Sequence, residues 1–309
     1  MTYAPTRDRR MPDRSPRPET ATRQRPPAPP GPSRRTVTRR RLAADLRNLG
    51  LPAGRPVLVH ASLSQIGYVK FGAETVIDAL LGVLGPNGTL VAGAGTPENS
   101  TTSRAFLQRT DGLTQEAVER YCAQMPAFDR KHTPTSVGAI AEALRTWPGA
   151  ERSAHPQSSF AAVGREARAL MADHRVKCHL GEDSPLAKLY DRDALILMVG
   201  VGYRACSAFH LAEYRYCERP PRRVYSCVVK KWGNPRWLEY RDVVLDDSDF
   251  EFIGNHVEGV LEDQGTMLSG TVGHAPSRLI PMRSVVDLAG RWLADNRKFA
   301  PVAIRSQTW

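Results

Sequence analysis

The clearest pattern in the chain begins with Leu195-Ile-Leu-Met-Val-Gly-Val-Gly202 and continues as Tyr203-Arg-Ala-Cys-Ser-Ala-Phe-His-Leu-Ala-Glu-Tyr-Arg215. A short apolar run followed by glycines predicts a buried strand that turns into a helix. On that helix His210 and Glu213 are three residues apart, which places imidazole and carboxylate on one face. A carboxylate that orients the ring suits it to general-base chemistry near neutral pH. Because open α/β sheets bind ligands beyond the carboxyl ends of their strands, we expect a functional site here.

Plainer interpretations of the same segment stay open. A His and a Glu at helical spacing also form ordinary structural hydrogen bonds. Cys206 lies four residues before His210 and could be a thiolate nucleophile activated by that His. Cysteine is equally at home as a small buried hydrophobe, and we favour that interpretation.

The other histidines and the cysteines do not form a metal-site pattern. The chain has eight His and five Cys, with no C-x-x-C pair and no His pair at the spacing of a zinc helix. We therefore expect no metal, and the odd cysteine count favours a reducing compartment over a disulfide scaffold. The glycine turns match neither the dinucleotide nor the P-loop fingerprint.

The order of the predicted elements indicates an α/β fold. The opening reads as strand 56–60, helix 74–84 and strand 89–92, which implies two neighbouring parallel strands. Further strands are predicted at 159–163, 194–200, 225–230, 237–240 and 271–280, and further helices at 39–48, 114–125, 137–146, 165–174, 207–218, 248–262 and 282–296. Ser248 and Glu251 predict a capping box for the helix at 248–262. We expect a layered α/β/α domain with a mixed, mainly parallel sheet, to which the adjacent strands after Pro221 add an antiparallel edge.

The basic charge of the chain is concentrated at its start. Of the formal net charge of +11, residues 1–41 supply twelve Arg against three acidic residues, so the remainder is nearly neutral. Residues 1–35 are rich in Arg and Pro and poor in large aliphatic side chains, and we predict that they are disordered. Residues 36–309 are predicted to form a single domain. A neutral fold with a basic tail argues against nucleic-acid binding. With no apolar run long enough for a membrane span and no signal peptide, we expect a cytoplasmic protein.

Two loops are rich in hydrogen-bond donors. Ser62 and Ser64 follow the first strand, where backbone N–H groups and hydroxyls can meet a diphosphate or a pantetheine amide. Residues 152–160 place His155 among Ser and Pro residues just before a strand. Either loop could also be an ordinary connection.

Taken together, these segments resemble the aminoglycoside 3-N-acetyltransferase family, also called the antibiotic N-acetyltransferases. The resemblance runs in order over about residues 38–297. Its landmarks are Val57-Leu-Val-His-Ala-Ser-Leu-Ser64, the run 73–88 with its Leu-Gly-Pro-Asn-Gly-Thr-Leu ending, Met125-Pro-Ala-Phe-Asp129 with Thr133-Pro-Thr135, Arg152-Ser-Ala-His-Pro156, Gly181-Glu-Asp-Ser-Pro-Leu-Ala187, Gly200-Val-Gly202, His210-Leu-Ala-Glu213 and Gly270-Thr-Val-Gly273.

The resemblance implies transfer of an acetyl group from acetyl-CoA to a small-molecule amine, without metal or acyl-enzyme, on a fold unlike that of the Gcn5-related acetyltransferases. By position, His210 would be the base and Glu213 would orient it or hold the amine. The contacts to CoA would come from Ser62, Leu63, Ser64, Ser184 and Leu186. The substrate contacts would come from Asp129, His155 and Arg204.

Two departures from the family pattern concern charge. In the family that the chain resembles, many members have an acidic residue at the position of Arg204. The residue after Asp129 is usually Pro in that family and is Arg130 here. Both additions disfavour a polycationic substrate. The same chemistry on another biosynthetic amine, for instance one that carries a phosphonate or nucleotide group, and a catalytically silent ligand-binding homologue therefore remain alternatives. The residues do not determine the oligomeric state, and a homodimer is one of the states they allow.

Overall fold

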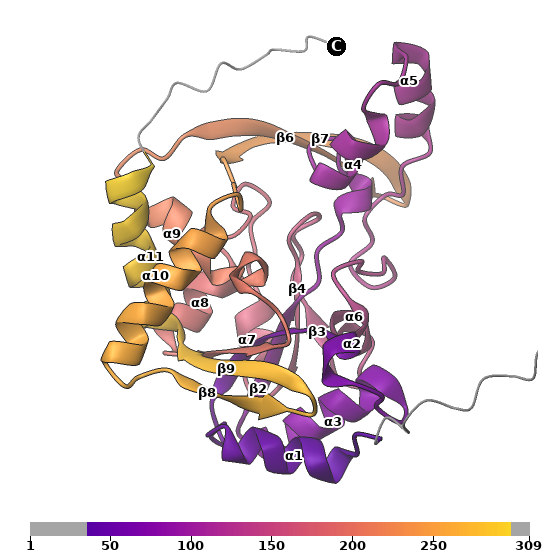
Figure 1. The fold of residues 1–309 in the computed structure, drawn as a ribbon. Helices are drawn as coiled ribbons and strands as arrows, with labels where there is room; N and C mark the ends of the chain where they lie inside the picture. Colours follow the sequence, from indigo (N-terminus) through magenta and orange to yellow (C-terminus); the bar gives the residue numbers. More distant parts are fainter. Residues whose placement is uncertain (1–35, 298–309) are drawn as a thin grey trace, which may run out of the picture. The chain divides into compact units, whose positions relative to one another are not determined.

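A computed structural model describes residues 36–297 of the chain, and the predicted disordered segment 1–35 lies outside the described residues. The centre of the described fold is a seven-stranded sheet with strand order β3-β4-β2-β1-β5-β9-β8 (Figure 1). The strands are β1 (Pro56–Ala61), β2 (Thr89–Gly93), β3 (Glu151–Arg152), β4 (Phe160–Gly164), β5 (Leu195–Val199), β8 (Leu268–Val272) and β9 (Ala275–Pro281).

The sheet is mixed, with a parallel centre. Strand β1 pairs in parallel with β2 on one side and β5 on the other, whereas β4 and β9 run antiparallel to their neighbours. Because β3 and β8 reverse direction once more, β4 and β9 are the two strands that oppose the common direction. The predicted fold class is confirmed. The carboxyl ends of β1, β2 and β5 consequently meet at one edge of the sheet, which positions the site.

Helices cover both faces of this sheet. On one side lie α1 (Arg39–Asn48), α2 (Leu63–Ile66), α3 (Gly72–Leu84) and α6 (Ala139–Arg145); on the other lie α7 (Ala167–Met171), α8 (Pro185–Asp191), α9 (Ala208–Arg215), α10 (Phe250–Asp263) and α11 (Met282–Asn296) (Figure 1). The alternation of side chains along β5 produces the two layers. Ile196 and Met198 join one apolar core, and Leu195, Leu197 and Val199 join the other.

The strands predicted at 225–230 and 237–240 do not extend the sheet edge, so that prediction is wrong. They belong to a separate antiparallel ribbon of β6 (Arg222–Lys231) and β7 (Asn234–Val243) (Figure 1). The ribbon's inward side chains Tyr225, Cys227 and Tyr240 form a small core of their own. Isolated bridges from Cys227 and Val229 tie the ribbon to the segment that carries η1 (Pro97–Asn99), α4 (Arg104–Thr110) and α5 (Gln115–Ala123). The antiparallel edges of the main sheet come instead from β4–β3 and β9–β8.

Two local predictions also need correction. The single strand expected at 271–280 belongs to a hairpin, because Gly273 turns the chain at a φ of +66°. Helix α10 starts after Asp249, and its N-cap makes no side-chain hydrogen bond. The capping box of Ser248 and Glu251 does not form, since the Glu251 carboxylate accepts a hydrogen bond from the Arg204 N–H instead. Between residues 36 and 297 no helix combines the length and the apolar character that crossing a membrane would require.

Candidate active site

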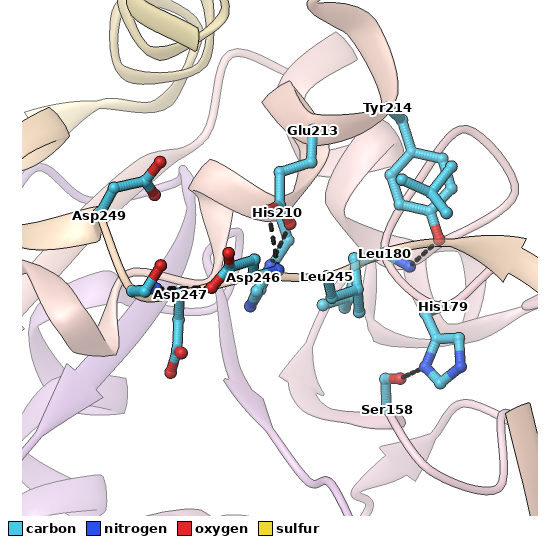
Figure 2. A network of polar contacts seen from close by, with 12 residues as sticks. Ser158, His179, Leu180, His210, Glu213, Tyr214, Leu245, Asp246, Asp247 and Asp249 are labelled. Atoms are coloured by element: carbon cyan, nitrogen blue, oxygen red, sulfur yellow. Dashed lines mark hydrogen bonds and ion pairs between the residues drawn. The ribbon is translucent and has the colours of Figure 1, made fainter. Parts of the chain in front are cut away.

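The His210 and Glu213 side chains meet on α9. Nδ1 of His210 and Oε2 of Glu213 are 2.6 Å apart (Figure 2). The helix is aimed by the turn after β5, where Gly200 has a φ of +64° and a Cβ would lie 2.4 Å from Cβ of Gln65. Only glycine fits there without displacing its neighbour. The turn and η2 (Tyr203–Ala205) thus bring α9 to the carboxyl edge of the sheet.

The Glu213 carboxylate is fully buried and accepts hydrogen bonds on both oxygens. Besides His210, it accepts from Nη1 of Arg297 at 2.5 Å and from the backbone N–H of Asp246 at 2.9 Å (Figure 2 shows the Asp246 bond). Arg297 also contacts both carboxylate oxygens of Asp249 at 2.7 Å. Burial lowers the pKa of Arg297, but its bonds to Asp249 and Glu213 outweigh this and raise the pKa above its usual range.

This arrangement fixes the tautomer of the neutral imidazole. A carboxylate only accepts hydrogen bonds, so Nδ1 of His210 carries the hydrogen of the bond to Glu213. Nε2 then keeps its lone pair. The ring rests on Phe250, with centroids 4.7 Å apart, and its side chain is 18% exposed. The geometry gives a partly exposed imidazole hydrogen-bonded to a buried carboxylate, an arrangement suited to general-base chemistry.

Two cavities are lined by residues that lie close to this dyad along the chain. The strand-end cavity, of about 250 Å³, lies at the carboxyl ends of β1, β2 and β5 and is lined by Val59, His60, Ala61, Ala92, Gly93, Val137, Gly138, Ile140, Ala141, Val201, Ala205 and Ser207. The ribbon cavity, of about 330 Å³, lies under β6 and is lined by Gly95, Pro97, Ser100, Thr102, Ser103, Val137, Gln157, Ser158, His179, Arg223, Tyr225 and Leu245.

The dyad has a neighbour in each cavity. Val137 lines both. Ser207 of the strand-end cavity precedes His210 by one helical turn, and the two are linked by a backbone hydrogen bond. Leu245 of the ribbon cavity adjoins Asp246, whose N–H holds Glu213. The dyad is therefore linked to both cavities through Ser207 and Leu245, although neither His210 nor Glu213 lines them.

Unsatisfied polar atoms gather around these cavities. Within residues 36–297, the buried side-chain atoms without a hydrogen-bond partner are His60 Nε2, Asn99 Oδ1, Ser207 Oγ and Arg223 Nε. Three of them belong to residues that line the two cavities. Buried polar groups are normally paired, so unpaired atoms beside the cavities mark this region as a candidate binding site. Burial lowers the pKa of His60 to about 4, which keeps this ring neutral at neutral pH.

Comparison with known proteins decides the family. A family model described as aminoglycoside 3-N-acetyltransferase matches residues 58–294. Aminoglycoside N(3)-acetyltransferase VII of Streptomyces paromomycinus is 36% identical over 272 residues, which cover 84% of this chain and 92% of that protein. The chain belongs to the aminoglycoside 3-N-acetyltransferase family. The resemblance inferred from the sequence is thus confirmed, and the protein is an enzyme of the aminoglycoside N(3)-acetyltransferase type.

Solved structures of this family share the fold. The crystal structure of YokD from Bacillus subtilis superposes with a TM-score of 0.77 at 33% identity, covering 84% of this chain and 94% of YokD. The structure of AAC-IIIb in binary complex with CoASH gives a TM-score of 0.71 at 28% identity, covering 86% of this chain and 99% of AAC-IIIb. The architecture is therefore that of the aminoglycoside 3-N-acetyltransferases and differs from the Gcn5-related fold.

The family resemblance predicts His155 as a substrate contact, but its side chain has no free polar atom. Its side chain is buried, Nε2 contacts the Val176 carbonyl at 3.1 Å, and Nδ1 accepts from the N–H groups of Gln157 and Ser158. Burial, together with the neighbouring His179 and His174, lowers the pKa of His155 well below its usual value. This geometry does not support direct substrate contact. His155 instead shapes the loop that presents Ser158 to the ribbon cavity.

Ser184 and Leu186 also have structural roles. Ser184 is buried; its hydroxyl donates to the Gly181 carbonyl at 2.6 Å and accepts from the Leu186 N–H as the N-cap of α8. Leu186 is fully buried in the core. Neither reaches the cavities, so their positions do not support the predicted CoA contacts. The loop of Ser62, Leu63 and Ser64 does directly follow Ala61 of the strand-end cavity, and its two hydroxyls lie 3.1 Å apart.

The remaining predicted substrate residues lie away from the dyad cavities. Arg204 is exposed on η2 and lines neither cavity. Asp129 lines a separate hollow of about 490 Å³ with Arg130 and Lys230. Its carboxylate accepts from the N–H groups of His132 and Lys131, and the His132 bond is the main cause that lowers the pKa of Asp129 to about 2.

The interpretation of Cys206 as a core residue is confirmed. It is fully buried, and burial raises the pKa of its thiol to about 12, which rules out a thiolate at neutral pH. The residues that the sequence did not indicate are Arg297, His60 and Ser207. Ser207 could have been found from its place at the start of α9, but Arg297 reaches Glu213 across 84 positions and gives no local signal.

Proposed function

We propose that the enzyme transfers the acetyl group of acetyl-CoA directly to a primary amine of an aminoglycoside, with His210 as the general base. The observation that carries this proposal is the His210–Glu213 dyad, which Ser207 and Leu245 link to two nearby cavities. The printed names of the relatives support the acceptor class, and the CoASH complex of AAC-IIIb supports the donor.

The strand-end cavity fits the pantetheine arm of acetyl-CoA. Small residues such as Ala61, Ala92 and Gly93 leave a narrow, mainly apolar space at the carboxyl ends of the parallel strands. The unpaired Ser207 hydroxyl and the neutral His60 ring can bond polar groups of the arm or the thioester. Ser62, Leu63 and Ser64, which directly follow Ala61, would contact the arm at the end of β1.

The chemical step then needs one base. As the amine nitrogen bonds to the thioester carbon, Nε2 of His210 takes a proton from that nitrogen. Glu213 holds the resulting imidazolium through Nδ1, and Arg297 and the Asp246 N–H keep Glu213 in place. When the tetrahedral intermediate collapses, the carbon–sulfur bond breaks and the proton on His210 passes to the leaving thiolate. The products are CoASH and an N-acetyl amide, without an acyl-enzyme.

A second candidate is the same transfer to an amine other than a polycationic aminoglycoside. The specific observation in its favour is that the charged side chain lining the ribbon cavity is Arg223 rather than a carboxylate. This candidate shares the donor, the base and the products, so it differs only in the acceptor.

The test is a thiol-release assay with acetyl-CoA across aminoglycosides and other primary amines, with mass spectrometry of the N-acetyl product. Amine-dependent thiol release and a singly acetylated amine are expected. Thiol release that no amine accelerates would contradict acetyl transfer and would favour a ligand-binding protein that has lost the activity.

A further inference from the structure

The ribbon cavity has an unusual wall for a site that receives an amine. Its polar lining consists of hydroxyls, an amide, the His179 ring and the Arg223 guanidinium. Among residues 36–297, no Asp or Glu side chain lines it. Burial is the main cause that lowers the pKa of His179 to about 3, and Arg223 contributes, so this ring adds no negative or positive charge at neutral pH. The cavity therefore has a single formal charge in its wall, and that charge is positive.

Arg223 is held rigidly with part of its hydrogen-bonding capacity free. Its Nη2 donates to the Thr102 carbonyl at 2.7 Å, and its guanidinium stacks on the Tyr225 ring at 4.4 Å. The Nε–H is buried and has no partner among the described residues. Although Nε is not accessible, Arg223 lines the cavity, and a planar guanidinium is suited to a carboxylate or phosphate oxygen.

The acid nearest to Arg223 in the ribbon register does not neutralise it. Asp242 is the cross-strand partner of Arg223. Its carboxylate accepts hydrogen bonds from the His179 N–H at 2.6 Å, the Tyr214 hydroxyl at 2.6 Å and the Val243 N–H at 2.8 Å. In the described part of the chain, no carboxylate comes within ion-pair distance of Arg223. A partly buried cation without a counter-ion is costly, and an anionic ligand would offset that cost.

We propose that the ribbon cavity is a subsite for an anionic oxygen group, carboxylate or phosphate, on the amine substrate, with Arg223 as its charged donor. The inference rests on the proposed acetyl transfer and favours its second candidate, because the acceptor would be an amino sugar or similar amine that carries an acidic group away from the reacting nitrogen. The amine end would lie at His210, near Asp246, whose N–H bonds to Glu213 (Figure 2). The anionic end would lie under β6. Such a substrate places its negative charge beside Arg223, whereas a polycation would place a positive charge there.

A binding measurement tests this without requiring turnover. Glucosamine and glucosamine 6-phosphate present the same amine and differ by one phosphate. Each is titrated calorimetrically into the full chain saturated with CoA, for the wild type, Arg223→Gln and Arg241→Gln. Arg241 lies on the same ribbon but is exposed, opposite Val224. Its substitution removes the same charge outside the cavity.

The wild type and Arg241→Gln should bind the phosphorylated sugar about 10- to 100-fold more tightly than glucosamine, as expected for a hydrogen bond to a charged group. Arg223→Gln should abolish the preference, and Arg223→Lys, which keeps the charge, should restore part of it. Equal binding of the two sugars by the wild type, or a preference that survives in Arg223→Gln, would overturn the proposal.

The other source of an anionic oxygen is the cosubstrate, and a second arm distinguishes it. CoA and pantetheine, which lacks the nucleotide phosphates, are titrated into the same variants. The proposal expects Arg223→Gln to leave both affinities within about twofold of the wild type. A selective loss of CoA affinity with unchanged sugar binding would place a CoA phosphate at Arg223 and overturn the assignment to the substrate. Because both arms measure binding, they remain decisive even if no amine is acetylated.

Discussion

Replacement of Glu213 by Gln should inactivate the enzyme by reversing the tautomer of His210. The two carboxylate oxygens face different partners. Oε1 faces two donors, Arg297 Nη1 and the Asp246 N–H, whereas Oε2 faces His210 Nδ1 alone. A Gln amide has one oxygen and one NH₂ group, and the oxygen will remain with the two donors. The NH₂ group then faces Nδ1, which must accept, so the ring hydrogen moves to Nε2.

A protonated Nε2 cannot take a proton from the attacking amine. The expected loss in kcat is that of a general base, about 100- to 10,000-fold, because the cosubstrate contacts are untouched. The assay is steady-state thiol release with acetyl-CoA and an accepted amine, with the KM for acetyl-CoA expected within about twofold of the wild type. The matched control is Glu258→Gln. This change on α10 breaks the ion pair of Glu258 with Arg278 of β9 and should keep near-normal turnover. A Glu213→Gln enzyme with kcat within about threefold of the wild type would refute the tautomer argument.

Three further outcomes follow from the charges of the described residues. Arg297→Met should lower the free energy of unfolding, measured in urea, by about 3 kcal/mol, because the buried Glu213 carboxylate loses its cationic partner. Arg297→Lys should recover part of this loss. A change below about 1 kcal/mol would show that the ion pair is not needed for stability. Arg204→Asp should change kcat/KM for a polycationic aminoglycoside by less than about threefold, because the side chain is exposed, and a larger gain would place Arg204 beside the substrate. The melting temperature should fall as the pH drops from about 6.5 to about 4. Burial lowers the pKa of His174 to about 4, so the unfolded state takes up protons first, and about 3 kcal/mol of stability per such His is lost over that window. A flat melting profile over this range would contradict the neutral buried state.

The order of elements was predictable wherever an apolar run ended in a glycine turn. This holds for α3, β2 and β5, which end at or just before Gly85, Gly93 and Gly200, whereas β1 was predicted from its apolar run and α9 from its place after the β5 turn. Helix α8 was missed because it is only seven residues long, although Ser184 as N-cap and Pro185 in the first turn are typical of a helix start. The place of the β6–β7 ribbon could not be predicted. The residues of a strand indicate which strand it pairs with, but they do not indicate on which surface of the fold the pair lies.

The candidate active site likewise has residues that the sequence predicts and residues that only the fold reveals. His210 and Glu213 were predicted because a spacing of three on one helix is visible in the sequence. The groups that hold Glu213 come from Asp246 and Arg297, 33 and 84 positions away, and only the fold brings them together. His155, Ser184 and Leu186 show the converse limit. They lie in the family's motifs, yet their hydrogen bonds and burial shape loops and core rather than the cavities.

The most direct test of the account compares His210→Ala with the wild type in acetyl transfer and in CoA binding. If His210 is the base, kcat should fall by about 100- to 10,000-fold, while the Kd for CoA measured by calorimetry stays within about twofold. Turnover close to that of the wild type at neutral pH would contradict the central claim that His210 removes the proton from the attacking amine.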